Sequence, residues 1–74
     1  MNIMNFTDAC RMFGDLWQLY KIYAGQQLTE NEMETFVDET RRLHDKYNRS
    51  KFCLDMILAI VGEVERTDKH FRKE

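Results

Sequence analysis

Residues 28–47 read LTENEMETFVDETRRLHDKY, and this stretch decides the fold. Thr29 followed three residues later by Glu32 fits a capping box, in which each side chain accepts a hydrogen bond from the backbone N–H of the other residue. The apolar residues that follow recur every three or four positions, and charged residues fill the positions between them. The pattern predicts an amphipathic helix over residues 30–47 with one face in water.

Helical patterns also lie on both sides of this stretch. Between about residues 7 and 24 two apolar stripes run side by side, and we expect Thr7 to begin that helix and Gly25 to end it. The stripes are Cys10, Phe13, Trp17, Tyr20 and Ala24, and Met12, Leu16, Leu19 and Tyr23. Between about residues 51 and 69, after Ser50 as the expected N-cap, apolar residues cover most of a third helix, which predicts burial on several sides. Short connections between the three helices predict an all-α, three-helix up-down-up bundle.

The composition excludes several classes of protein. The 74 residues include 11 basic and 13 acidic ones, for a net charge of −2, and 43% are apolar. The apolar share is too high for a disordered chain, and the negative charge argues against nucleic-acid binding by bulk charge. Two cysteines do not make a secreted disulfide scaffold, and neither a membrane span nor a signal peptide is evident. We therefore expect one cytoplasmic domain over residues 1–74, away from membranes.

No combination of residues predicts catalysis. The sequence has no phosphate-binding glycine loop, no nucleophile motif and no dinucleotide turn, so we expect no enzyme and no cofactor. Cys10, His44 and Cys53 fall near one end of the expected bundle, where they could hold a zinc ion or form a redox thiol pair. Their spacing has no metal-binding signature, and cysteine is commonly a small core residue. The sequence therefore predicts no metal site, although it does not establish whether the three converge.

One segment is rich in basic residues. Residues 41–51 contain a single acid, Asp45, and five cations, Arg41, Arg42, Lys46, Arg49 and Lys51. Cations at the end of a helix offset its dipole, which favours a solvated helix end. The alternative is a phosphate contact, which would make the protein a nucleic-acid or nucleotide binder with Tyr47 stacking on a base. We keep this as the alternative function.

Aromatic residues gather in the first helical segment and just before it, where Phe6, Phe13, Trp17, Tyr20 and Tyr23 are five of the nine in the chain. A three-helix monomer has difficulty burying all of them, and aromatic residues are enriched at the centres of protein interfaces. Either this helix is central and fully internal, or part of its surface meets a second chain. We favour the second interpretation and expect a homodimer through the first helix and part of the third. The expected contact residues are Leu16, Trp17, Tyr20 and Tyr23.

Residues 46–66 read KYNRSKFCLDMILAIVGEVER. This stretch resembles the last helix of short helical proteins encoded by phages and prophages of Gram-positive bacteria, which pair it with an aromatic-rich first helix. The resemblance covers about the last third of the chain and, more loosely, residues 13–20. It brings no established activity, but it implies a small protein that binds a host protein. We therefore predict a non-enzymatic protein-binding module, a phage accessory protein that inhibits a bacterial immune factor in the cytoplasm of the host.

Overall fold

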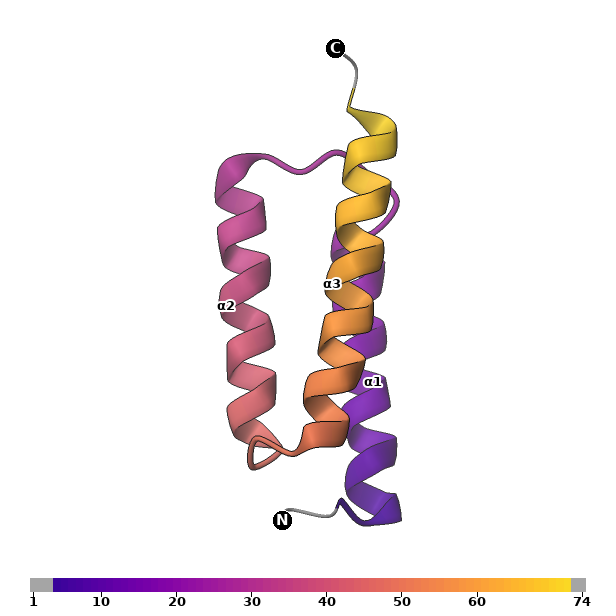
Figure 1. Cartoon of the computed structure of the whole chain (residues 1–74), viewed down its shortest axis with the longest axis vertical. Coiled ribbons are helices and arrows are strands. Elements are labelled where there is room, and N and C mark those ends of the chain that lie inside the picture. Colours follow the sequence, from indigo (N-terminus) through magenta and orange to yellow (C-terminus); the bar gives the residue numbers. More distant parts are fainter. Residues whose placement is uncertain (1–3, 73–74) are drawn as a thin grey trace.

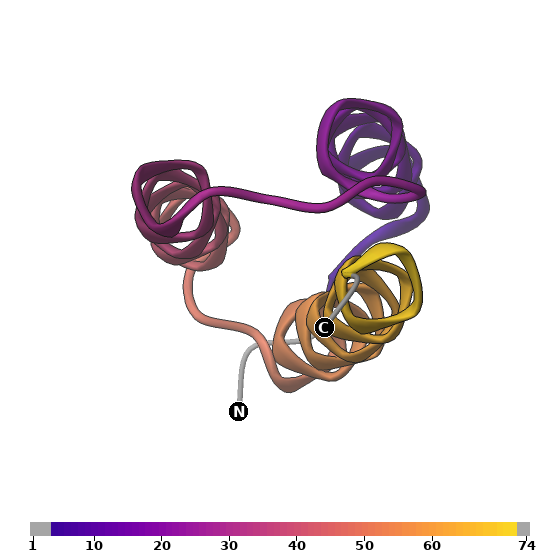
Figure 2. The same cartoon turned by 90° about the horizontal axis from the view of Figure 1, so that it is seen from above.

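This computed structural model describes residues 4–72, which form three α-helices joined by two short connections. The helices are α1 (Phe6–Tyr23), α2 (Glu30–Lys46) and α3 (Lys51–Phe71). α1 and α3 run in the same direction and α2 runs against them (Figure 1), and seen from above the three helices form a triangle (Figure 2). The prediction of an all-α, three-helix up-down-up bundle is confirmed.

Side-chain caps begin α2 and α3 as the sequence predicts. The backbone N–H of Glu32 donates to Thr29 Oγ1 at 3.1 Å, and the backbone N–H of Thr29 donates to Glu32 Oε1 at 2.9 Å. Before α3, Ser50 Oγ accepts a hydrogen bond from the backbone N–H of Cys53 at 3.0 Å. Each bond satisfies a backbone donor that the helix itself leaves unpaired, so these two boundaries follow from local chemistry.

The start of α1 differs from the prediction. Asn5, not Thr7, is the N-cap, and its Oδ1 accepts a hydrogen bond from the backbone N–H of Asp8 at 2.8 Å. Asparagine caps at least as well as threonine, so the helix begins one residue earlier than expected and Thr7 lies within its first turn. The end is as predicted, because Gly25 adopts the left-handed conformation after the helix, with a φ of 77°.

The hydrophobic core takes one stripe of α1 and leaves the other outside. Its two clusters consist of Met12, Leu16, Tyr47, Cys53 and Ile57 near one end, and of Leu19, Tyr23, Leu28, Phe36 and Val64 near the other. Only the stripe that starts at Met12 faces both neighbouring helices. The expectation that α3 is buried on several sides is wrong: Phe52 is 42% exposed and Leu58 is 58% exposed. With only two neighbours, α3 keeps an uncovered outer side.

Asp68 of α3 accepts hydrogen bonds from the α1–α2 connection and from the C-cap of its own helix. The backbone N–H of Leu28 donates to Asp68 Oδ1 at 2.7 Å, and Arg72 donates to Asp68 Oδ2 at 2.9 Å. The hydrogen bonds from Arg72 and from Leu28 outweigh burial and lower the pKa of the Asp68 carboxyl. Asp68 therefore remains ionised and ties the α1–α2 connection to α3.

Candidate functional site

A groove with apolar walls runs between α1 and α3 on the outside of the bundle. Its volume is about 440 Å³. We call this groove together with Phe52 at its lower end the aromatic face. The groove is lined by Phe13, Leu16, Trp17, Tyr20, Met56, Ala59 and Ile60.

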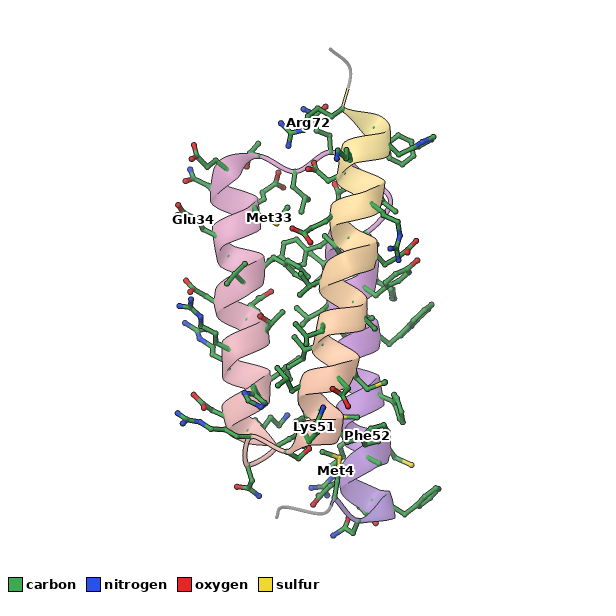
Figure 3. The ribbon with its side chains drawn as sticks, in the orientation of Figure 1. Met4, Met33, Glu34, Lys51, Phe52 and Arg72 are labelled. Carbon is green, nitrogen blue, oxygen red and sulfur yellow. The ribbon has the colours of Figure 1, made fainter. Side chains whose placement is uncertain are left out.

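The rings of the aromatic face are arranged in two pairs. Phe13 of α1 packs edge-on against Phe52 of α3, with ring centroids 5.7 Å apart, and Figure 3 shows Phe52 at the start of α3. One turn further along α1, Trp17 stacks on Tyr20 with centroids 6.0 Å apart. Phe13 is 47% exposed and Trp17 is 58% exposed. Phe13, Trp17 and Phe52 thus pack against neighbouring rings and still present about half of their surface to water.

The four predicted contact residues separate into two groups. Leu16 and Tyr23 are buried, with 4% and 8% of their surface exposed, and belong to the core. Leu16 forms only the floor of the groove, whereas the Tyr23 ring packs on Phe36 with centroids 5.0 Å apart. Trp17 is exposed and Tyr20 is half-buried, so these two lie on the surface.

The sequence interpretation did not name the residues that α3 contributes to the aromatic face. Phe52, Met56 and Ala59 follow one another at four and three positions, which places them on one side of a helix. The signal was present, but it was merged into a pattern of apolar residues all around α3. Only the packing distinguishes this side from the buried one.

Most of the predicted basic residues are neutralised by neighbouring carboxylates. Lys46 Nζ lies 2.8 Å from Asp15 Oδ2, Arg49 Nε lies 2.8 Å from Asp45, and Lys51 Nζ lies 2.9 Å from Asp55. Arg41 lies 4.0 Å from Asp38, so within residues 4–72 only Arg42 of the five has no ion pair. A phosphate would have to compete with these carboxylates, which disfavours the alternative function.

Asp15 is the centre of the best-organised polar contact at this end. Lys46 and the Tyr47 hydroxyl both donate to Asp15 Oδ2, at 2.8 and 2.6 Å. Burial raises the pKa of the Asp15 carboxyl, but the two hydrogen bonds outweigh it and hold the pKa below its usual value. Burial and the bond to Asp15 raise the pKa of Tyr47. The arrangement ties the end of α2 to α1, and it supplies neither a free base nor a free cation.

The three possible zinc ligands do not form a binding site. Cys10 is exposed, whereas Cys53 is fully buried and its Sγ lies 3.9 Å from the Leu43 carbonyl oxygen. Burial raises the pKa of the Cys53 thiol, which keeps it protonated and unreactive. Over the described residues, no group of three or more His, Cys, Asp or Glu side chains is placed to hold a metal ion.

Comparisons with known proteins add no family to this picture. Among the helices of residues 4–72, none has the length and apolar character needed to cross a membrane. No family model matches the chain, and no curated protein or solved structure resembles it significantly.

Proposed function

We propose that this protein is a non-enzymatic protein-binding module and that the aromatic face is its contact surface. One observation carries the proposal: Phe13 and Trp17 line one apolar groove, Phe52 packs against Phe13 beside it, and all three are 42–58% exposed. Single exposed apolar residues are ordinary on a protein surface, but a contiguous apolar patch is typical of an interaction site.

The chemistry of the aromatic face suits another protein better than a small molecule. The groove is open along its length and lies between two parallel helices, so it can receive the apolar side of a further helix. Aromatic residues and methionine are the types that protein interfaces enrich, and Trp17 and Met56 supply both. No cation of the basic segment lines the groove.

The identity of the partner rests on the resemblance of residues 46–66 to phage-encoded proteins. That resemblance favours a bacterial protein of the host, and an immune factor is the partner we propose. Inhibition would then come from covering a surface of that factor.

Retention of host proteins by immobilised variants tests the proposal. We expect wild-type protein to retain a specific protein from a host lysate, and we expect Trp17→Ala to lose it. Ile22→Ala is the matched control, because Ile22 is also on α1 and 53% exposed but does not line the groove. Equal retention by Trp17→Ala, or loss with Ile22→Ala alone, would contradict the assignment.

A further inference from the structure

The outer side of α3 has an unusual composition. Asp55, Ala59, Gly62 and Arg66 follow one another at four, three and four positions, so they form one line along the helix, which we call the outer line. The line lies opposite the buried side, which contains Cys53 and Val64. Its centre has only small side chains, and open space surrounds the position of a Cβ at Gly62.

Apolar surface borders the outer line on both sides. Toward α1 lies the aromatic face. Toward α2 lies a second, smaller groove of about 240 Å³, beside which Leu58 is 58% exposed. A surface helix of a bundle ordinarily shows charged residues opposite its buried side. On α3 the side opposite the buried one is apolar for about two turns, and charged residues lie only at the two ends of this apolar section.

The order of these charges is informative. Lys51 pairs with Asp55 before the apolar section, and Glu63 pairs with Arg66 after it. On the outer line itself, the negative Asp55 precedes the apolar section and the positive Arg66 follows it. If two such helices cross in opposite directions about an axis midway between positions 59 and 62, Asp55 of one meets the opposite charge of the partner's Arg66. If the two helices ran in the same direction, Asp55 would meet the partner's Asp55 and the two charges would repel.

We propose that a second copy of this chain covers the aromatic face, with the two α3 helices packed antiparallel along their outer lines. The inference rests on the proposed function, because the second copy occupies the same contact surface, where a host protein would have to compete with it. The antiparallel axis also places Ala59 against the partner's Gly62, so that the two backbones can approach closely. The negative Asp55 and the positive Arg66 of the outer line are thus complementary to those of the partner only in the antiparallel arrangement.

The area of the exposed rings agrees with an interface that includes α3. Phe13, Trp17 and Phe52 are about half exposed, and rings of this size carry 150–250 Å² each, so together they offer about 300 Å². A stable interface buries about 800 Å² on each partner. The rings alone are therefore insufficient, and the outer line with Leu58 beside it supplies adjoining surface for the rest.

Charge exchange tests the arrangement. Light scattering should give the mass of two chains at about 100 µM, with little change in high salt. Asp55→Arg should weaken dimerisation about tenfold, as should Arg66→Asp, because each change creates two like-charge contacts per dimer. The double variant should recover the wild-type affinity to within about threefold, since it restores opposite charges across the interface. Circular dichroism confirms that each variant remains helical.

A disulfide test keeps the proposal falsifiable should a charge variant fail to fold. In a Cys10→Ser background, Asp55→Cys combined with Arg66→Cys should form covalent dimers on mild oxidation. Within one chain the two positions are about 16 Å apart along the helix, too far for a disulfide. Arg66→Cys alone is the control and should remain uncrosslinked, because the antiparallel arrangement separates the two copies of position 66 by at least a similar distance.

Each outcome of these experiments either supports or overturns the antiparallel dimer. A mass of two chains, recovery in the double charge variant and crosslinking only of the paired cysteines support the antiparallel dimer. A monomer at about 100 µM overturns the dimer. The proposed function would then still be supported if wild-type protein retains a host protein that Trp17→Ala loses. A dimer whose affinity does not change in the charge variants overturns the antiparallel arrangement. Covalent dimers formed with Arg66→Cys as the only added cysteine would also overturn it.

Discussion

Replacement of Phe36 is the sharpest test of the core. Phe36 is fully buried, and its ring packs on Tyr23 at 5.0 Å within the cluster that also contains Val64. Truncation of a buried phenylalanine to alanine costs about 3–5 kcal/mol. A chain of this length has a free energy of unfolding of about 4–11 kcal/mol in total. Phe36→Ala should therefore lose a large share of the stability, and Phe36→Leu should lose about 1 kcal/mol.

Urea unfolding followed by circular dichroism measures these changes. All variants are compared at the same protein concentration, because association would add to the apparent stability. Phe6→Ala is the matched control: Phe6 is 84% exposed, so its replacement should change the free energy of unfolding by less than about 0.5 kcal/mol. If Phe36→Ala and Phe6→Ala shifted stability equally, the packing of α2 onto α1 and α3 described above would be wrong.

Three further predictions concern caps, charge and thiols. Thr29→Ala removes one side of the capping box and should cost about 1 kcal/mol in urea unfolding. Asp68→Asn should destabilise the protein at neutral pH, because the Arg72 and Leu28 contacts lower the pKa of Asp68. The Asp68 contribution is present above the ordinary carboxyl pKa and is lost as pH falls through the lowered one, so the gap to wild type should narrow between about pH 5 and pH 2. In the native protein, iodoacetamide should modify exposed Cys10 rapidly and buried Cys53 only after unfolding, as mass spectrometry can follow.

Each of these three predictions has an outcome that would contradict it. An unchanged unfolding midpoint in Thr29→Ala would mean that the capping box contributes nothing measurable. A gap between Asp68→Asn and wild type that stays constant with pH would remove the electrostatic role of Asp68. Equal alkylation rates of Cys10 and Cys53 in the folded protein would contradict the burial of Cys53.

Local chemistry made much of the fold predictable. The Thr29–Glu32 capping box, the Ser50 cap and Gly25 act within a few residues of themselves, so the sequence is enough to place them. The number and direction of the helices followed from these boundaries and from short connections. Even the one wrong cap, Thr7, lies only two residues from the observed cap, Asn5.

The orientation of each helix about its own axis was not predictable in the same way. α1 carries two apolar stripes, and nothing local decides whether Met12 or Trp17 faces the neighbouring helices. That choice depends on contacts between residues far apart in sequence, such as the hydrogen bond from Tyr47 to Asp15, 32 positions away. For this reason two of the four predicted contact residues lie in the core, while the contribution of α3 went unnamed.

The molar mass and helicity of wild type and Trp17→Ala, measured side by side, test the central claim most directly. The account predicts that wild type has the mass of two chains and that Trp17→Ala is a folded, helical protein with the mass of one. Three results would contradict it: a wild-type monomer, a Trp17→Ala variant that unfolds, or a Trp17→Ala variant that keeps the mass of two chains. The second would make the aromatic face part of the core, and the third would place the interface elsewhere.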